Sequence, residues 1–498
     1  MRPSRLSRHP HARASCKRSW GRYAAVGGSF AALTSAGLFG AGCASAQAPA
    51  ATVPTAPVAV APATWTERDW SADFTATPVR PANGFFAGQG LDVAFDQMGA
   101  AWGIGEFAMQ ATRAKGDAAT THQLPIKAYG NWQWTKPFRS LLNGGQRSES
   151  SDLGESVIYA AGAVWIAQGG GQDAGLTQNH SILTRISTTA PYTACQIPIP
   201  GDNQHLIGLA HDTKRNRVYF ATSEGPDGSN LGWVKAGGLG PRCQNGLDYG
   251  GNPALTATQN AALAVAAQQT IDGLRCTSAQ DATATGNCVH VEPVSMPTGA
   301  AHLAYDAASD SLWSTNWADR VLRQYELASR TLLTHTAPES PYTGPALFGA
   351  TPWQIAANAT HVFMTEYNGH RLLSFEKATG TWSAIETPLD LLGVDGLDVQ
   401  THSLTLSGDS LWFTVADEEH GVATAVGRVS VSGWAAGTPH GVLYSGWGEG
   451  HSFRGVDVSP TGAVALADAP DGATLLLTPR IPAPAKCSPG IIECGGGA

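Results

Sequence analysis

A histidine and a glutamate stand at places in this chain where they could do chemistry. His402 opens one short apolar run, and Glu366 closes another. A carboxylate beside an imidazole can orient the ring as a general base near neutral pH. We therefore predict His402 as a catalytic base and Glu366 as the carboxylate that holds it. The alternative is that both side chains only bond neighbouring loops or ordered channel water.

Other polar or aromatic side chains lie at the start or end of similar runs. We predict that they bind substrate: Trp353, Asn316, Glu155, Arg454 and His451. Asp417 and Glu418 offer the carboxylate oxygens that Mg²⁺ or Ca²⁺ prefers, so they are the predicted metal ligands; a solvated acidic loop is the alternative. The chain contains no P-loop, dinucleotide fingerprint, G-x-S-x-G elbow or H-E-x-x-H motif. We predict no nucleotide or organic cofactor.

The runs that carry these residues are typical of short β-strands. Residues 352–388 divide into four of them, separated by turns that contain Asn and Gly, as expected for strands and tight turns. The second of the four recurs along the chain as AWGIG (101–105), VWIAQ (164–168), VYFAT (218–222), LWSTN (312–316), VFMTE (362–366), LWFTV (411–415) and VALAD (464–468).

The spacing of these seven copies predicts the fold. From Trp313 to Phe363 is 50 residues, from Phe363 to Trp412 is 49, and from Trp412 to Ala465 is 53. A four-stranded repeat of this length is the mark of a β-propeller blade. We predict an all-β, seven-bladed β-propeller of four-stranded antiparallel blades over residues 64–482. First-strand starts and second-strand ends then share one rim, so the candidate residues converge on a funnel.

Two segments depart from the repeat. Residues 241–287 interrupt the third blade between its third and fourth strands, with a helical pattern at Thr258–Ile271. The seventh blade offers only three strands near the C-terminus. We predict that Ser71–Val79 closes the ring beside Ala473–Pro479, because closure removes exposed strand edges.

The N-terminus is typical of an export leader. Seven basic residues lie between Arg2 and Arg22, and no acidic residue precedes Glu67. We predict a leader over residues 1–46, with an A-x-A cleavage site at 44–46 or a lipoprotein box at Cys43 as alternatives. An Ala/Pro-rich tether spans 47–63. The expected location is extracytoplasmic: periplasmic, secreted, or an outer-membrane lipoprotein that meets the membrane only through its lipid.

Charge and cysteines fit export. Without the seven basic residues of the leader, 24 Lys and Arg face 39 Asp and Glu, a net charge of -15, which argues against nucleic acid as a partner. An even number of cysteines beyond the leader predicts disulfides. We expect a local Cys487–Cys494 bridge in the tail at 483–498. The pairing of the other four stays open: Cys195, Cys243, Cys276 and Cys288.

Two stretches resemble a known family. The sequences PWQIAA and VFMTEYNGHRLLSFE within 352–376, and THSLTLSGDSLWFTVAD at 401–417, are similar to the repeats of streptogramin B (virginiamycin B) lyases, as is VGRVSV at 426–431. The resemblance implies a seven-bladed propeller whose funnel holds Mg²⁺ and a base that opens a macrocyclic ester by elimination. The family's histidine matches His402. Its glutamates fall on Gln400 and Ala416, and the preceding repeat's histidine falls on Trp353.

Two functions follow as hypotheses. The first is a metal-assisted lyase or hydrolase that acts on an ester-containing or lactone-like small molecule in the funnel. The second is a non-catalytic cell-envelope module that binds a ligand or partner through the same rim, whose long loops suit binding. We expect a monomer in either case.

Overall fold

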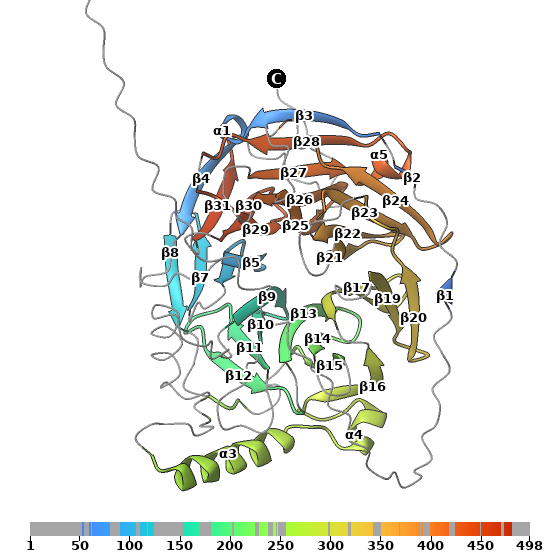
Figure 1. Ribbon diagram of the computed structural model, residues 1–498. Coiled ribbons are helices and arrows are strands. Elements are labelled where there is room, and N and C mark those ends of the chain that lie inside the picture. Colours follow the sequence, from blue (N-terminus) through green and yellow to red (C-terminus); the bar gives the residue numbers. More distant parts are fainter. Residues whose placement is uncertain are drawn as a thin grey trace, which may run out of the picture. The chain divides into compact units, whose positions relative to one another are not determined.

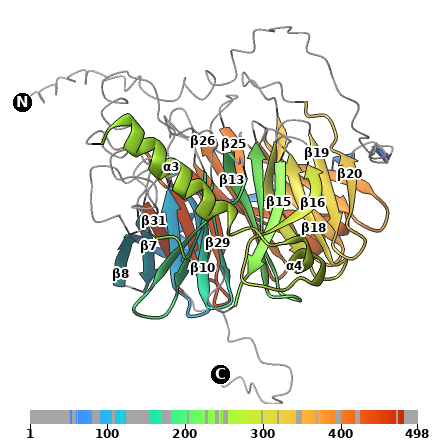
Figure 2. The same ribbon diagram turned by 90° about the horizontal axis from the view of Figure 1, so that it is seen from below.

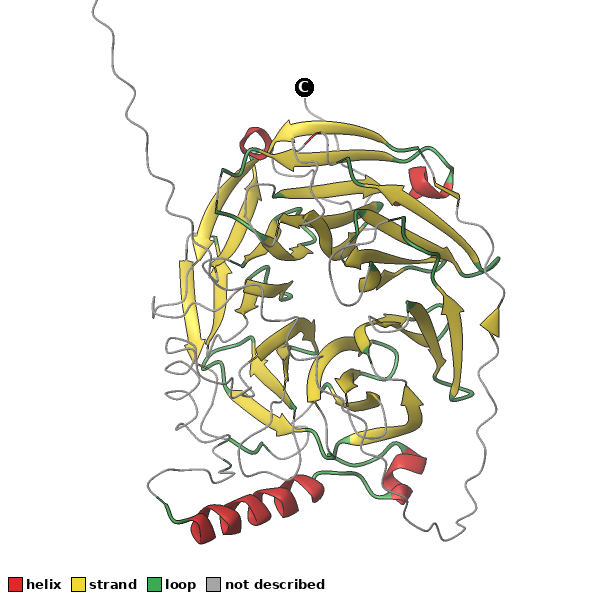
Figure 3. Ribbon diagram, viewed as in Figure 1, coloured by secondary structure: helices red, strands yellow, loops and turns green. Residues whose placement is uncertain are grey.

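The computed structural model confirms the seven-bladed propeller, with seven antiparallel sheets arranged around a central axis (Figure 1). It describes residues 52–480 with gaps, the longest being 80–89, 124–152, 170–180, 248–254, 342–349, 392–398 and 418–423. Strands form the ring, and the helices lie at its outside (Figure 3). Within the described residues, no helix combines the length and the apolar character needed to cross a bilayer.

Six blades are each built from four consecutive strands, the first strand being innermost. Blades 1 to 3 contain β5 (Gly90–Phe95), β6 (Ala101–Gly105), β7 (Gln110–Lys115), β8 (Ala118–Gln123); β9 (Leu153–Ala160), β10 (Ala163–Gly169), β11 (Ile182–Ser187), β12 (Ala194–Pro198); and β13 (Gln204–Asp212), β14 (Arg217–Glu224), β15 (Ser229–Lys235), β16 (His290–Met296). Blades 4 to 6 contain β17 (Ala300–Asp306), β18 (Ser311–Asn316), β19 (Val321–Glu326), β20 (Thr331–Thr336); β21 (Thr351–Ala357), β22 (His361–Tyr367), β23 (Arg371–Glu376), β24 (Thr381–Glu386); and β25 (Val399–Ser407), β26 (Ser410–Asp417), β27 (Ala425–Ser430), β28 (His440–Ser445), with α5 (Val431–Ala435) before β28.

The seventh blade joins the two ends of the propeller. It contains β29 (Phe453–Val458), β30 (Val464–Asp468), β31 (Ala473–Pro479) and, as outermost strand, β4 (Phe74–Val79). β4 runs antiparallel to β31, with Phe74 opposite Pro479 and Val79 opposite Thr474. This confirms the predicted closure. Each innermost strand contacts the innermost strand of the next blade, and β29 contacts β5, so the ring is complete.

The chain before β4 adds further strands that the sequence did not predict. β3 (Thr64–Asp69) pairs parallel to β28 as a fifth strand of blade 6 and leads into the short helix α1 (Trp70–Asp73). Two short stretches of the predicted tether, β1 (Thr52–Val53) and β2 (Ala59–Val60), pair in the same parallel sense with β20 and β24. The N-terminal segment thus pairs with the outer strands of three successive blades.

The insertion in blade 3 lies where the sequence placed it, between β15 and β16. It contains α3 (Ala257–Asp272) and α4 (Ser278–Thr283), each with a threonine capping box at its start. α3 lies on the outside of the ring (Figure 2) and packs Ala267 and Ile271 against Ile182 of blade 2. Two disulfides resolve the open pairing: Cys195–Cys243 and Cys276–Cys288.

Apolar side chains between neighbouring blades form the core. Tryptophans of the repeated second-strand signature are fully buried there, among them Trp102, Trp165 and Trp313. Between blades 5 and 6, Phe363 packs into the same cluster as Phe413. Because these signature residues pack against the next blade, the repeated sequence supplies the contacts that hold neighbouring blades together.

A threonine in the signature of blades 4 and 5 links each blade to the next. Thr365 Oγ1 accepts the N–H of Gln354 in its own blade at 3.1 Å and donates to the carbonyl oxygen of His402 at 2.8 Å. Thr315 in blade 4 donates in the same way to the carbonyl oxygen of Trp353. These hydrogen bonds fix the inner strand of one blade against the inner strand of the next.

Candidate functional site

Every innermost strand carries a β-bulge near its start. At each bulge the pairing with the second strand shifts, leaving one or two residues on the inner strand unpaired. A bulge re-aims side chains and often lies beside functional sites. The bulge positions are Leu91, Glu155, Ile207, Ala301–His302, Trp353–Gln354, His402–Ser403 and Arg454. Four predicted site residues, Glu155, Trp353, His402 and Arg454, therefore occupy equivalent places around the axis.

Four rings gather where blades 4, 5 and 6 meet the axis. The Trp353 ring lies 5.1 Å from His302, 5.1 Å from Tyr367 and 6.3 Å from His402 between ring centroids. Tyr367 lies 5.9 Å from His402. Trp353 and Tyr367 are half-buried, whereas both histidines are buried. We call these four residues the axial ring cluster. His302 and Tyr367 were not among the site residues predicted from the sequence, although Tyr367 directly follows Glu366 and His302 lies at an inner-strand start.

His402 is held in one tautomer. Its Nδ1 lies 2.8 Å from the carbonyl oxygen of Arg454. Because a carbonyl only accepts, Nδ1 carries the hydrogen and Nε2 carries the lone pair of the neutral ring. Burial, followed by the nearby Arg454 charge, lowers the pKa of His402 to about 3. The imidazole is therefore neutral at physiological pH.

His302 is a second neutral imidazole in the cluster. It is 7% exposed, and its Nε2 has no hydrogen-bond partner among the described residues. Burial and the neighbouring His402 lower the pKa of His302 to about 3. The cluster thus contains two uncharged imidazoles beside two larger aromatic rings, an environment suited to a ring-bearing ligand.

Glu366 does not orient His402, which corrects the predicted pairing. Its carboxylate, which is fully buried, accepts Nε of Arg371 at 2.8 Å and a second guanidinium nitrogen of Arg371 at 2.6 Å. Arg320 approaches the same carboxylate at 3.5 Å, and Ser340 donates to it at 3.0 Å. The strands are neighbours as expected, but the buried arginine outcompetes the imidazole because its charge needs a counterion.

The turn after Glu366 explains why this ion pair forms. β22 and β23 are joined by a tight turn that brings Glu366 and Arg371 together. A Cβ at Gly369 would lie 2.5 Å from Oε2 of Glu366, so only glycine leaves room for the carboxylate. The E-Y-N-G-H-R sequence at 366–371 is therefore a structural turn. Glu366 has the structural role that the sequence analysis kept as its alternative.

A carboxylate–imidazole pair does occur in blade 7. Nδ1 of His451 lies 2.6 Å from Oδ2 of Asp468, and Oδ1 of Asp468 accepts the N–H of Ser452 at 3.0 Å. Asp468 is 1% exposed, and the His451 side chain is 31% exposed. The register explains the contact, because Phe453, two residues after His451, pairs with Asp468. A buried carboxylate that holds a partly exposed imidazole is suited to general acid–base chemistry.

Comparison with solved structures finds the same architecture. A streptogramin B lyase structure matches with a TM-score of 0.51 and 11% identity over 83% of this chain and 100% of that chain. A catalytically inactive histidine-to-alanine virginiamycin B lyase from Staphylococcus aureus, with quinupristin, matches with a TM-score of 0.50 and 12% identity over 81% and 99%. The fold is that of the streptogramin lyases. Neither a scan against protein-family models nor a search of the curated proteins finds a match.

The described residues of this streptogramin-lyase-like propeller include no group of three carboxylates or histidines at the axis. The two positions where the family resemblance implies glutamates are Gln400 and Ala416, which pair with each other across β25 and β26. Glu366 is neutralised by Arg371. Burial, and after it the nearby Arg454 charge, lowers the pKa of His402; the same Arg454 charge disfavours a second cation there. Among the described residues, the one cluster of three His, Cys or carboxylate ligand atoms lies instead in blade 3.

The remaining predicted residues have mixed positions. Asn316 ends β18 and is fully buried. The Asp417 backbone ends β26, but its side chain lies outside the described residues, as does all of Glu418. Cys487 and Cys494 also lie outside them. The predicted metal ligands and the predicted tail disulfide therefore stay predictions.

Proposed function

We propose that this protein binds a ring-bearing small molecule at the axial ring cluster. The observation that carries the proposal is the convergence of Trp353, Tyr367 and His402, whose centroids lie 5.1 to 6.3 Å apart, with both larger rings half-buried. Half-buried aromatic rings bind apolar ligand faces by stacking and edge contacts. The hydrogen bond from Nδ1 to the Arg454 carbonyl fixes the orientation of the His402 ring beside these two aromatic rings.

The charges at the other bulge positions favour a ligand that also carries polar groups. Glu155 and Arg454 occupy equivalent places on the inner strands of blades 2 and 7. An ester or lactone joined to aromatic rings has both features, and quinupristin, which accompanies the virginiamycin B lyase of matching fold, is a suitable probe.

Binding can be tested with quinupristin and a panel of aromatic lactones by tryptophan fluorescence and calorimetry. Trp353→Ala should weaken the affinity of a bound probe by about fivefold, because one aromatic contact contributes about 1 kcal/mol. Trp65→Ala is the matched control, since Trp65 lies in β3 on the outer edge of blade 6. Equal loss in both variants, or none in Trp353→Ala, would contradict the axial site.

The second candidate function is acid–base cleavage of an ester or lactone without a bound metal. The His451–Asp468 contact favours it. Asp468 would hold Nδ1–H of His451, and Nε2 would take a proton from the carbon next to a carbonyl. The resulting electron pair would form a double bond while the carbon–oxygen bond breaks and a carboxylate leaves. If the same base takes its proton from a water molecule instead of from that carbon, the reaction is hydrolysis.

Turnover of the same panel can be followed by mass spectrometry, which separates elimination from hydrolysis by the mass of one water. Asp468→Asn and His451→Ala should each lower turnover by about 100-fold, whereas His402→Ala should change probe affinity more than rate. Activity that survives His451→Ala but is lost in His402→Ala would assign the base to the axial cluster. A panel that binds without turnover would favour the non-catalytic envelope role.

We also propose an extracytoplasmic location. The two disulfides, Cys195–Cys243 and Cys276–Cys288, are compatible with an oxidising compartment. Cell fractionation with Cys43→Ala and its parent tests the location and the lipid anchor together. Protein that stays in the cytosol would reject the export proposal, and unchanged membrane association of the variant would reject the anchor.

A further inference from the structure

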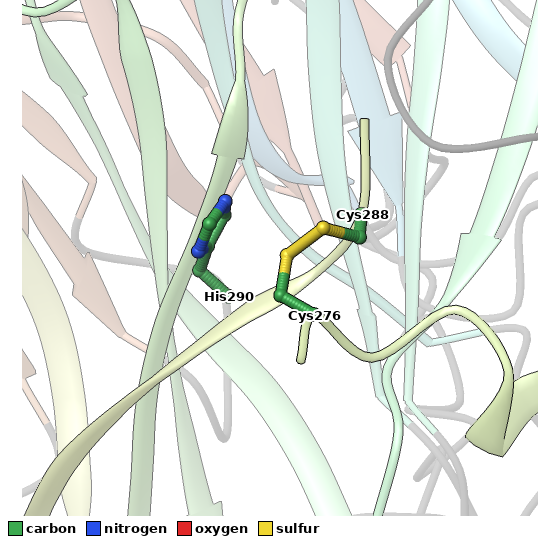
Figure 4. Close-up of side chains that lie close together, drawn as sticks. All are labelled: Cys276, Cys288 and His290. Carbon is green, nitrogen blue, oxygen red and sulfur yellow. A yellow bond between two sulfur atoms is a disulfide. The ribbon is translucent and has the colours of Figure 1, made fainter. Parts of the chain in front are cut away.

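A cluster in blade 3, away from the axial ring cluster, contains two cysteines and a histidine. The two Sγ atoms of Cys276 and Cys288 and one ring nitrogen of His290 all lie within 4.8 Å of one another. The cysteines form a disulfide, and the imidazole lies beside it (Figure 4). We call these three residues the blade 3 cluster.

The backbone around β16 positions the cluster. Cys288 and His290 are two residues apart, at the point where the chain enters β16. Cys276 is brought alongside by a backbone hydrogen bond from its N–H to the carbonyl of Val289 at 3.0 Å. Gly286, at a φ of +99°, makes the approach close, because a Cβ there would lie 3.0 Å from Sγ of Cys288.

His290 is held as a metal-ligating histidine usually is. Its Nδ1 lies 2.8 Å from Oδ1 of Asp281 in α4, and its ring stacks on Trp233 at 3.6 Å. The carboxylate fixes the hydrogen on Nδ1, so Nε2 carries the lone pair. A carboxylate on the far nitrogen is the common outer partner of a zinc-bound imidazole.

The other ring nitrogen supplies a second, independent observation. His290 is 2% exposed, and its Nε2 has no hydrogen-bond partner among the described residues. A buried polar atom without a partner is costly and calls for an explanation. A bound cation in the reduced form of the cluster provides one, because two thiolates and one imidazole are ligands that Zn²⁺ prefers.

We propose that the blade 3 cluster is a redox-gated zinc site: on reduction of the disulfide, Cys276, Cys288 and Nε2 of His290 bind Zn²⁺, with Asp281 positioning the imidazole. This site is independent of the proposed axial function. In the oxidised protein both sulfurs are committed to each other and the site cannot form.

A phosphine can supply the two electrons that reduce the disulfide. A phosphine takes the oxygen of one water molecule to become a phosphine oxide, and its electron pair and the two protons of that water convert the disulfide into two thiols. Zn²⁺ then displaces the two thiol protons into solvent, so binding is accompanied by proton release.

The experiment titrates Zn²⁺ into the full chain, oxidised and phosphine-reduced, against a chromophoric chelator. The matched control is Cys276→Ser/Cys288→Ser, which keeps all other thiols. The reduced wild type should hold one more tightly bound Zn²⁺ than this control, and the oxidised protein should lack that site. His290→Gln and Asp281→Asn should each weaken the site about tenfold. A Co²⁺ spectrum with thiolate charge-transfer bands, lost in the serine control, would identify the ligands.

Two results would overturn the proposal. One is equal zinc content in the reduced wild type and the serine control. The other is an unchanged affinity in both His290→Gln and Asp281→Asn, whose side chains contact each other. Circular dichroism verifies folding of each variant. If the serine variant does not fold, His290→Gln and Asp281→Asn together still decide, because both replacements leave the two cysteines in place and Asp281 is only partly buried.

Discussion

Nδ1 of His451 lies 2.6 Å from Oδ2 of Asp468, so the loop that enters blade 7 is tied to the end of that blade's second strand. Such a pair was predicted from the sequence between His402 and Glu366. The structure forms it in blade 7 because Asp468, unlike Glu366, has no arginine five residues later in a tight turn. Its second oxygen instead accepts the backbone N–H of Ser452.

Replacing this carboxylate should destabilise the loop. Asp468→Asn keeps the shape of the side chain but replaces one accepting carboxylate oxygen with a donating NH₂ group. That group then faces either His451 or Ser452. We expect a loss of about 1–3 kcal/mol in the free energy of unfolding, the cost of an unsatisfied buried hydrogen bond. Urea denaturation measures it. Glu386→Gln, an exposed carboxylate in β24, is the control and should change stability by less than about 0.5 kcal/mol.

The Glu366–Arg371 ion pair should matter to stability more than to chemistry. Arg371 is 3% exposed and Glu366 is fully buried, so Glu366→Gln leaves an uncompensated buried charge. We expect a loss of about 3–5 kcal/mol in the free energy of unfolding. Glu366→Gln/Arg371→Met should recover part of it, as measured by urea denaturation. A double variant no more stable than Glu366→Gln would contradict the role of the unpaired charge.

Two buried groups, His302 and Asp92, should make the free energy of unfolding depend on pH in opposite directions. The pKa of His302 is lowered to about 3, below its unfolded value near 6.5, so its contribution is present above pH 6.5 and is lost as pH falls toward 3. Burial raises the pKa of Asp92 to about 7. Its contribution is present at low pH and is lost as pH rises from about 4 to 7.

Variants separate these two effects. Between pH 7.5 and pH 4.5, His302→Phe should lose roughly 2–3 kcal/mol less unfolding free energy than the wild type, because the unfolded imidazole no longer gains a proton. Asp92→Asn should shift in the opposite direction by a similar amount. Urea denaturation at both pH values gives each difference. Shifts of the same sign in the two variants would contradict this assignment.

The ring was predictable from the sequence because its parts repeat. Six of the seven second strands carry a signature with a tryptophan or phenylalanine that packs between blades. The last four signatures recur at intervals of 50, 49 and 53 residues, which leaves little choice of architecture. The insertion helix and the closing strand followed from the same repeat, as interruptions of it. β1, β2 and β3 did not follow, because parallel addition to an outer edge needs only short stretches with no repeated pattern.

The candidate site was predictable in position but not in pairing. The repeat register placed Trp353, His402 and Arg454 at equivalent starts of inner strands. It could not show that Arg371 takes the Glu366 carboxylate or that a backbone carbonyl orients His402, because those choices depend on turn geometry within a few ångströms. His302 and Tyr367 were missed for a related reason: each lies one residue from a position that the repeat marks.

Removing the closing strand should test the ring as a whole. β4 buries Phe74 and Val79 and pairs with β31 along its length, so deleting residues 64–80 exposes the outer edge of β31 and removes the fifth strand of blade 6. The lost apolar burial amounts to several kcal/mol, and we expect the melting temperature to fall by at least about 5 °C. Deleting residues 64–69 alone removes β3 but leaves β4, and should cost much less, because blade 6 keeps its own four strands. Calorimetry on both deletions decides the matter: equal melting temperatures in the longer deletion and the wild type would mean that β4 does not close the ring.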